Sequence, residues 1–291
     1  MLQRATWQHL RIPFSIFLLP IFLFAYSYDP FVPWQPTLIV FVVLHLLVYP
    51  ASNGYNSYFD KDEGSIGGVE KPLPVSKELY WVSLVMDAVA ILLSWLLSWQ
   101  LAVMVFVYGL ISKAYSHPVV RLKKHPILGW LVVGAFQGYF TWWLVWQGLH
   151  GWQVEDFQSW SLHFPAILSS VLLWGSYPMT QVYQHVEDRS RGDITISLRL
   201  GVTGTFHFVA AIFGLSSAGY VWLFYKAFSP LAAVLFLVAL LPVLIYFGAW
   251  YFRVRKNEDK ADFKSTMRLN LLSSVMMIVY FVGLALFQHL F

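Results

Sequence analysis

Nine long apolar segments divide this sequence and limit what it can fold into. They cover residues 12–28, 36–59, 78–98, 100–116, 127–148, 163–186, 203–225, 230–252 and 268–289. A helix needs about 20 apolar residues to cross the hydrocarbon core of a membrane, and most segments reach or approach this length. We therefore predict an all-α fold, a polytopic membrane bundle of about nine transmembrane helices, formed by residues 1–291 as a single domain.

The composition agrees with a membrane protein. Only 12% of the 291 residues are charged and 58% are hydrophobic, whereas soluble domains carry roughly 25% charged residues. The chain has no cysteine, which excludes disulfides, thiolate metal ligands and a cysteine nucleophile. The net charge of +4 does not indicate a nucleic-acid partner, because the basic residues lie in short loops between apolar segments.

The basic residues also predict an orientation. With the N-terminus in the cytoplasm, 18 of the 19 Lys and Arg fall on the cytoplasmic side, and only Lys226 falls outside. Cytoplasmic loops of membrane proteins carry this excess of Lys and Arg. We expect a multi-pass protein of the cell inner membrane, with its N-terminus cytoplasmic and its C-terminus outside.

An internal repeat relates two of the predicted cytoplasmic corners. Residues 49–66 match residues 177–194 at a constant offset of 128, with six identities and two amide pairs. Asp60 corresponds to Asp188, and Asn56 corresponds to Gln184. Repeat-related corners in a membrane bundle often frame a binding site.

Each corner is expected to place polar side chains on one helix face. The first set is Asn53, Asn56 and Asp60, at i, i+3 and i+7, and the second is Gln181, Gln184, His185 and Asp188, at i, i+3, i+4 and i+7. Polar groups in a membrane helix are costly unless they face the bundle interior, so we expect the two faces to converge. Grouped oxygen ligands suit Mg²⁺. The alternative is that these amides only hold helices together.

Basic residues accompany both corners and the loop after the fourth segment. They include Lys71, Arg121, Lys123 and Arg189. Beside a metal, such cations can hold a diphosphate. The alternative is that they serve only the topology of the chain.

Two features lie inside the spans. Gly134 and Gly138 have the Gly-x-x-x-Gly spacing that is typical of close helix packing. Asp87 lies near the middle of the third segment. An ionisable group there is a functional candidate or the partner of a neighbouring polar side chain, and the sequence leaves both possibilities open.

Together these residues resemble a divergent member of the UbiA superfamily of intramembrane prenyltransferases. Residues 56–64, Asn-Ser-Tyr-Phe-Asp-Lys-Asp-Glu-Gly, are similar to the family motif Asn-Asp-x-x-Asp-x-x-x-Asp. Residues 184–195 are similar to its second motif, Asp-x-x-x-Asp followed by Gly and Thr, and the segments 71–74 and 115–129 also look like family loops. The departures are at Ser57, Gly64 and Gln184, where the family commonly has Asp. Nearby groups that could compensate are Asp62, Glu63, His185 and Glu187.

The resemblance implies Mg²⁺-dependent transfer of a prenyl group from an isoprenoid diphosphate to a lipophilic or aromatic acceptor within the bilayer. It implies Asp60 and Asp188 as catalytic residues that hold the metal with Asn56 and Gln184. The residues implied to bind diphosphate are Lys71, Arg121, Lys123, Arg189, Asn56 and Gln184. The alternative function is that of a catalytically weakened relative that binds or carries a lipid or small molecule. A secondary transporter fits the spans but does not explain cations grouped behind two acidic corners.

The predicted topology can be tested with fused reporters. Reporters placed after Lys71, Lys124, Arg191 and Lys256 should all report the cytoplasm, because the basic residues favour that side. Reporters placed after Asp156 and at the C-terminus should report the outer side. A cytoplasmic C-terminus would contradict an odd number of membrane crossings.

Overall fold

The computed structural model describes residues 2–61 and 64–290, so Asp62 and Glu63 lie outside the described part. The first half contains α1 (Arg4–Leu10), η1 (Ile12–Phe17), α2 (Leu19–Tyr28), α3 (Trp34–Phe41), η2 (Val42–Val48), α4 (Tyr49–Asp60), α5 (Glu78–Trp95), α6 (Trp99–Ser116), η3 (Leu122–Lys124), α7 (Pro126–Gly134), η4 (Ala135–Phe140) and α8 (Thr141–His150). The second half contains η5 (Glu155–Gln158), α9 (Trp160–Ser176), η6 (Tyr177–Thr180), α10 (His185–Arg191), α11 (Ile196–Ala227), α12 (Pro230–Lys256), η7 (Glu258–Lys260) and α13 (Phe263–Leu290).

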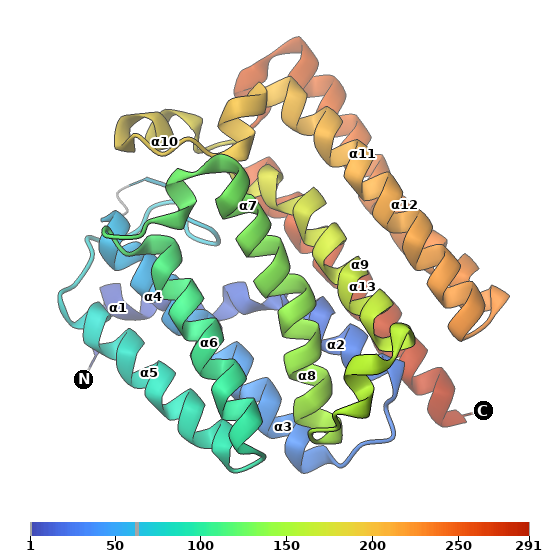
Figure 1. The fold of residues 1–291 in the computed structure, drawn as a ribbon. Coiled ribbons are helices and arrows are strands. Elements are labelled where there is room, and N and C mark those ends of the chain that lie inside the picture. The colour runs from blue at the N-terminus through green and yellow to red at the C-terminus, as the bar shows by residue number, and fades with distance from the viewer. Residues whose placement is uncertain (1, 62–63, 291) are drawn as a thin grey trace.

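The helices form a multi-pass membrane bundle, which confirms the predicted fold class. Within the described residues, seven segments are long and apolar enough to cross a membrane: Arg4–Tyr28, Trp34–Asp60, Glu78–Trp95, Pro126–His150, Ile196–Ala227, Pro230–Lys256 and Phe263–His289. The helices α6 and α9 run beside these segments (Figure 1) but fall outside that group. The expected number of nine is therefore approximate.

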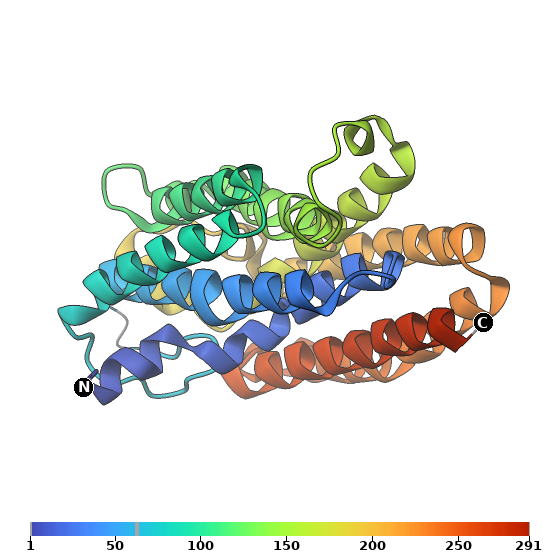
Figure 2. The same ribbon diagram turned by 90° about the horizontal axis from the view of Figure 1, so that it is seen from below.

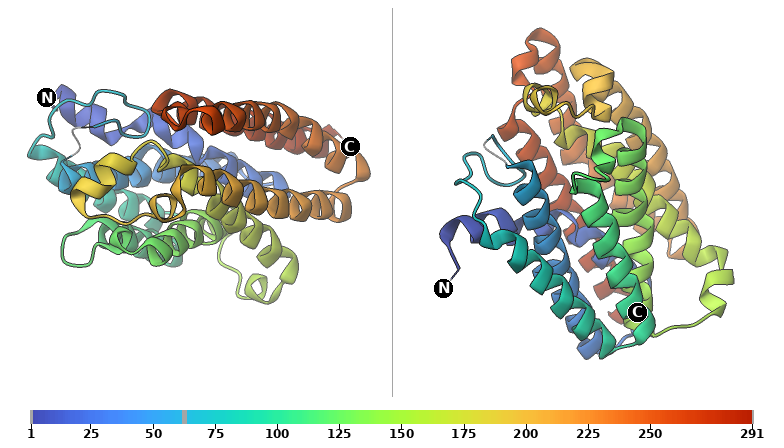
Figure 3. Two further views of the ribbon diagram at one scale, coloured as in Figure 1. Left: turned by 90° about the horizontal axis from the view of Figure 1, so that it is seen from above. Right: turned by 60° about the vertical axis from the view of Figure 1, so that its left-hand side comes forward.

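The two ends of the bundle differ in what they carry. The chain termini lie at opposite ends (Figures 2 and 3). The end with the N-terminus also carries α10, the loop between α6 and α7 and the α12–α13 turn, whereas the α5–α6 and α11–α12 turns lie at the other end with the C-terminus (Figures 1 and 3). The segments predicted to be cytoplasmic thus share one end of the molecule.

A proline shapes the first polar corner without ending its helix. Pro50 lacks an N–H group and would clash with a regular preceding turn, and the turn before it, η2, is π-helical. Such a local widening lets a helix continue past a lost hydrogen bond. The helix α4 runs on to Asp60, so Asn53, Asn56 and Asp60 share one helix face, as predicted.

The second polar corner is not a helix face, and this part of the prediction is wrong. The expected span 163–186 ends early, because α9 stops at Ser176 and is followed by the short 3₁₀ segment η6, which contains Pro178. The chain turns through Gln181 and Gln184 before α10 begins at His185. Pro178 matches Pro50 in the repeat. The helix α4 accommodates Pro50, whereas the chain changes direction after Pro178.

The consecutive helical segments α7, η4 and α8 pack closely against α9. A Cβ atom on Gly138 would lie 2.5 Å from the Cα and N atoms of Ser170. The Ser170 hydroxyl donates to the Gly134 carbonyl at 2.8 Å and accepts from the Tyr139 N–H at 2.8 Å. The packing role predicted for Gly134 and Gly138 is confirmed.

Asp87 has a structural partner. Its carboxylate, on α5, forms an ion pair with Lys113 in the last turn of α6, and both side chains are mostly buried. The Lys113 ammonium also lies 5.1 Å from the centre of the Tyr55 ring, on α4. The pair therefore links three helices behind the first polar corner.

Replacing Gly138 by Ala should destabilise the bundle by about 1–3 kcal/mol, because the added methyl group meets backbone atoms that cannot move aside. Thermal unfolding in detergent measures the effect. Gly248→Ala is the matched control, since a Cβ at Gly248 on α12 meets no atom within 4 Å. Equal melting temperatures for both variants would contradict the close approach.

Candidate active site

One cavity of about 610 Å³ joins the two polar corners. Its polar part is lined by Asn53, Asn56, Asp60, Lys123, Gln184, Asp188, Arg191, Asp193 and Thr195. Beyond these groups its wall is apolar and aromatic, and includes Tyr108, Phe136, Phe213, Tyr220, Phe236 and Met277. The cavity can therefore hold a molecule with a charged head and a hydrophobic tail.

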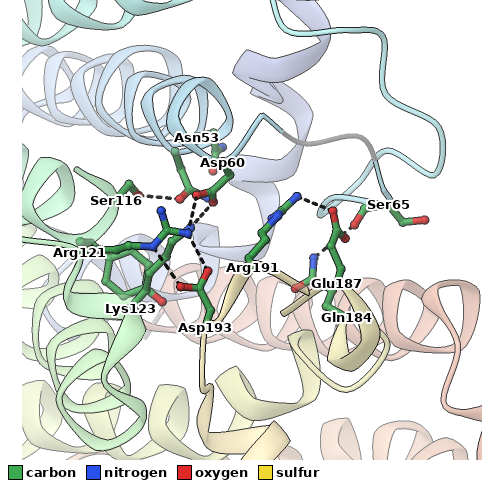
Figure 4. Close-up of polar contacts among 12 residues, drawn as sticks. Asn53, Asp60, Ser65, Ser116, Arg121, Lys123, Gln184, Glu187, Arg191 and Asp193 are labelled. Atoms are coloured by element: carbon green, nitrogen blue, oxygen red, sulfur yellow. Dashed lines mark hydrogen bonds and ion pairs between the residues drawn. The ribbon is translucent and has the colours of Figure 1, made fainter. Parts of the chain in front are cut away.

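Asp60, the last residue of α4, is held by two cations of the loop between α6 and α7. Its side chain is only 4% exposed and forms an ion pair with Lys123 (Figure 4). The Arg121 guanidinium lies 3.9 Å from Asp60 Oδ1. Removing a carboxylate from water costs several kcal/mol, so this burial depends on the nearby cations.

Arg121 is bound more tightly by another carboxylate. Its Nε and one terminal nitrogen donate to the two oxygens of Asp193 at 3.0 and 2.9 Å (Figure 4). This hydrogen bonding to Asp193 raises the pKa of Arg121 above its usual value. This two-bonded ion pair joins the loop after α6 to the segment after α10.

Asp188, on α10, is 8% exposed and lines the same cavity as Asp60. Burial raises the pKa of its carboxyl to about 6, against an ordinary value of 3.8. A hydrogen bond from the Thr195 hydroxyl, at 3.1 Å, and the charges of Lys123 and Arg191 act in the opposite direction. The two repeat-related carboxylates are thus brought to one cavity, although only the first lies on the expected helix face.

The two predicted amide ligands also line the cavity. Asn56 accepts a hydrogen bond from the Ser116 hydroxyl at 2.6 Å, and the Gln184 side chain donates to the Ser65 carbonyl at 3.2 Å. These contacts orient both amides.

The oxygen-rich donor set suits Mg²⁺, but it does not enclose a metal by itself. Across residues 2–61 and 64–290, no group of three or more His, Asp or Glu is gathered to hold an ion. Mg²⁺ is commonly held by one or two carboxylates together with substrate phosphates. The residues present fit a metal that arrives with a diphosphate.

The structure separates the predicted cations. Lys123 lines the cavity, whereas Lys71 and Arg189 are exposed and are not among the described lining residues. Of the groups expected to compensate for missing carboxylates, Glu187 pairs with Arg191 (Figure 4) and His185 contacts the Ser197 hydroxyl at 2.8 Å, and neither is among the lining residues.

Three charged groups line the cavity in addition to the predicted site residues: Arg11, Arg191 and Asp193. Arg191 lies three residues after Asp188, a spacing that places both on one face of a helix, so its position could have been predicted. No local pattern marks Arg11 or Asp193, whose places depend on tertiary contacts.

The comparisons with known proteins agree with the fold. The model of the UbiA prenyltransferase family matches residues 15–272. The chain therefore belongs to the UbiA prenyltransferase family. A comparison of the sequence with curated proteins finds no match.

Solved structures show the same fold at low sequence identity. An apo UbiA homologue from Aeropyrum pernix K1 has a TM-score of 0.70 and 17% identity, over 94% of this chain and 98% of that chain. A UbiA homologue from Archaeoglobus fulgidus, bound to DMAPP and Mg²⁺, has a TM-score of 0.69 and 14% identity, over 97% and 99%. A digeranylgeranylglyceryl phosphate synthase has a TM-score of 0.62 and 17% identity, over 97% and 98%.

The raised pKa of Asp188 predicts a pH-dependent stability. Between pH 3.8 and about 6 the folded protein retains a proton that the unfolded chain has lost, so this group's contribution to stability falls as pH rises through that range. In detergent with EDTA, Asp188→Asn should gain stability relative to wild type over the same range and then level off. A difference between Asp188→Asn and wild type that stays constant with pH would contradict the raised pKa of Asp188.

Proposed function

We propose that this protein transfers a prenyl group from an isoprenoid diphosphate to a lipophilic or aromatic acceptor within the membrane, in a reaction that depends on Mg²⁺. The observation that carries the proposal is the single cavity with Asp60, Asp188 and Lys123 at one end and an apolar, aromatic wall beyond them. Family membership supports the reaction class. The charge distribution supports the inner membrane, with the N-terminus in the cytoplasm.

The chain's own residues divide the work of holding the donor. Mg²⁺ would be held by Asp60 and Asp188, with assistance from Asn56 and Gln184. The bound ion would act as a Lewis acid on the diphosphate oxygens. Lys123 lies beside Asp60 and can neutralise charge that develops on the leaving diphosphate. The bond between the prenyl carbon and the diphosphate oxygen breaks with its electrons going to the oxygen. The acceptor then bonds to that carbon and loses a proton.

The aromatic wall suits the positive charge that develops on the prenyl group. Tyr108, Tyr177 and Phe136 line the cavity. The face of an aromatic ring attracts a cation, most strongly where water is excluded. The same apolar surface favours an isoprenoid chain.

The second candidate function is that of a binding or carrier protein that has lost the reaction. Ser57, Gly64 and Gln184 offer no carboxylate where related proteins commonly have one. The two remaining corner carboxylates, Asp60 and Asp188, must then suffice for the metal. The two functions differ in whether a diphosphate is consumed.

Diphosphate release from a panel of isoprenoid diphosphates, measured in one detergent preparation, tests the proposal. Asp60→Asn and Asp188→Asn should each lower release by about a hundredfold or more, because each removes charge that stabilises the reacting state. Gln184→Asp should tighten metal binding and keep or raise turnover, since it adds a carboxylate. Glu155→Gln, far from the cavity, should match wild type.

A binding protein would give another result. The folded wild type would release no diphosphate at any Mg²⁺ concentration, and ligand binding would survive both Asn substitutions. That outcome would contradict the prenyltransferase function and support the binding or carrier function.

A further inference from the structure

The loop between α6 and α7, residues 117–125, meets the segment after α10 at one buried contact. This contact is the two-bonded ion pair of Arg121 and Asp193, and the Asp193 side chain is only 5% exposed. The Asp193 N–H donates to the Asp188 carbonyl at 2.9 Å, so the acid is tied directly to the helix that carries the second corner carboxylate. The pair therefore connects one half of the site to the other.

Two cations of this loop differ in their main partner. Lys123 lines the cavity and pairs with Asp60. Arg121 binds both oxygens of Asp193, lies 3.9 Å from Asp60 Oδ1 and is not among the described residues that line the cavity. Arg121 and Asp193 together carry no net charge. Lys123 is thus the better placed of the two to meet a diphosphate.

The backbone of the loop needs this support. Arg121 has φ +42° and ψ +59°, a left-handed conformation that is uncommon for a residue with a side chain. On the other side, a Cβ on Gly129 would lie 3.1 Å from the Lys123 Cα atom, so the loop packs directly on the first turns of α7. Lys123 is therefore held between the packing on α7 and the Arg121–Asp193 pair.

We propose that Asp193 and Arg121 are positioning residues, a clamp that fixes the loop 117–125 so that Lys123 can pass from Asp60 to the diphosphate of the donor. This inference rests on the proposed function, because it names how that site holds its diphosphate. Arg suits the clamp, since its planar guanidinium binds both carboxylate oxygens at once. Lys suits the exchange, since its ammonium is a compact charge on a flexible chain.

Loop mobility gives the first test. The chain has no cysteine, so Val119→Cys, at a position 85% exposed in the loop, accepts a single nitroxide label. Asp193→Asn, which keeps the shape of the side chain, and Arg121→Gln should each increase label mobility in electron paramagnetic resonance spectra. Lys123→Gln should not. An unchanged spectrum for folded Asp193→Asn would overturn the clamp.

Affinity for inorganic pyrophosphate with Mg²⁺ gives the second test. Lys123→Gln should weaken binding by about ten- to a hundredfold, the effect of losing a hydrogen bond to a charged group. Asp193→Asn and Arg121→Gln should each weaken it by about three- to tenfold, and the double variant should be no weaker than either single one. Arg121→Lys should weaken pyrophosphate binding as much as Asp193→Asn does, because Lys cannot bind both carboxylate oxygens at once.

The outcomes separate this inference from the proposed function. If wild type binds no pyrophosphate with Mg²⁺, the proposed function itself fails. If wild type binds it but Arg121→Gln adds a further loss to Asp193→Asn, Arg121 contacts the ligand directly and the clamp is wrong. Glu70→Gln is the matched control: it breaks the exposed ion pair with Lys264, 3.6 Å, outside the cavity lining, and should alter neither the label nor the affinity.

Discussion

The site depends on the pairing of buried opposite charges. Asp60 and Asp193 are almost fully removed from water, and each buried carboxylate would cost several kcal/mol without a partner. Lys123 and Arg121, from one loop, provide the compensating charge. The same requirement brings that loop to α4 and to the segment after α10, which are distant in sequence. Asp188 accepts a hydrogen bond from a neutral hydroxyl, and its burial raises the pKa of its carboxyl to about 6.

The internal repeat shows how one sequence pattern can give two local structures and still serve one cavity. Pro50 and Pro178 occupy matching positions, yet α4 continues through the first and α9 ends just before the second. A proline removes one hydrogen bond in both cases, and the surrounding packing decides whether the helix widens or stops. The short helix α10 carries Asp188, the helix α4 carries Asp60, and both residues line the same cavity. Convergence of the two carboxylates therefore does not require symmetric helices.

Much of this architecture could be predicted from the sequence, because the length and spacing of apolar runs determine a membrane bundle directly. The face of α4 and the packing of Gly138 followed from helical periodicity. The structure of the second corner did not follow from periodicity. The sequence keeps a helical pattern beyond Ser176, whereas α9 ends at that residue. Asp193 was not among the predicted site residues for a related reason. Its importance comes from a contact with Arg121, 72 residues earlier in the chain, and no local spacing encodes such a contact.

A site with few carboxylates has a consequence for the order of events. In the structure the negative charge of Asp60 is already balanced by Lys123, so a cation that approached alone would have to displace an existing ion pair. If Asp60 holds Mg²⁺ as proposed, a diphosphate bound with the metal would give Lys123 another anionic partner, so that the Asp60 carboxylate could hold the metal. Each exchange makes the other less costly, and neither leaves a buried charge alone. Under the proposed function, a site whose corner carboxylates are Asp60 and Asp188 would therefore favour binding of metal and donor together.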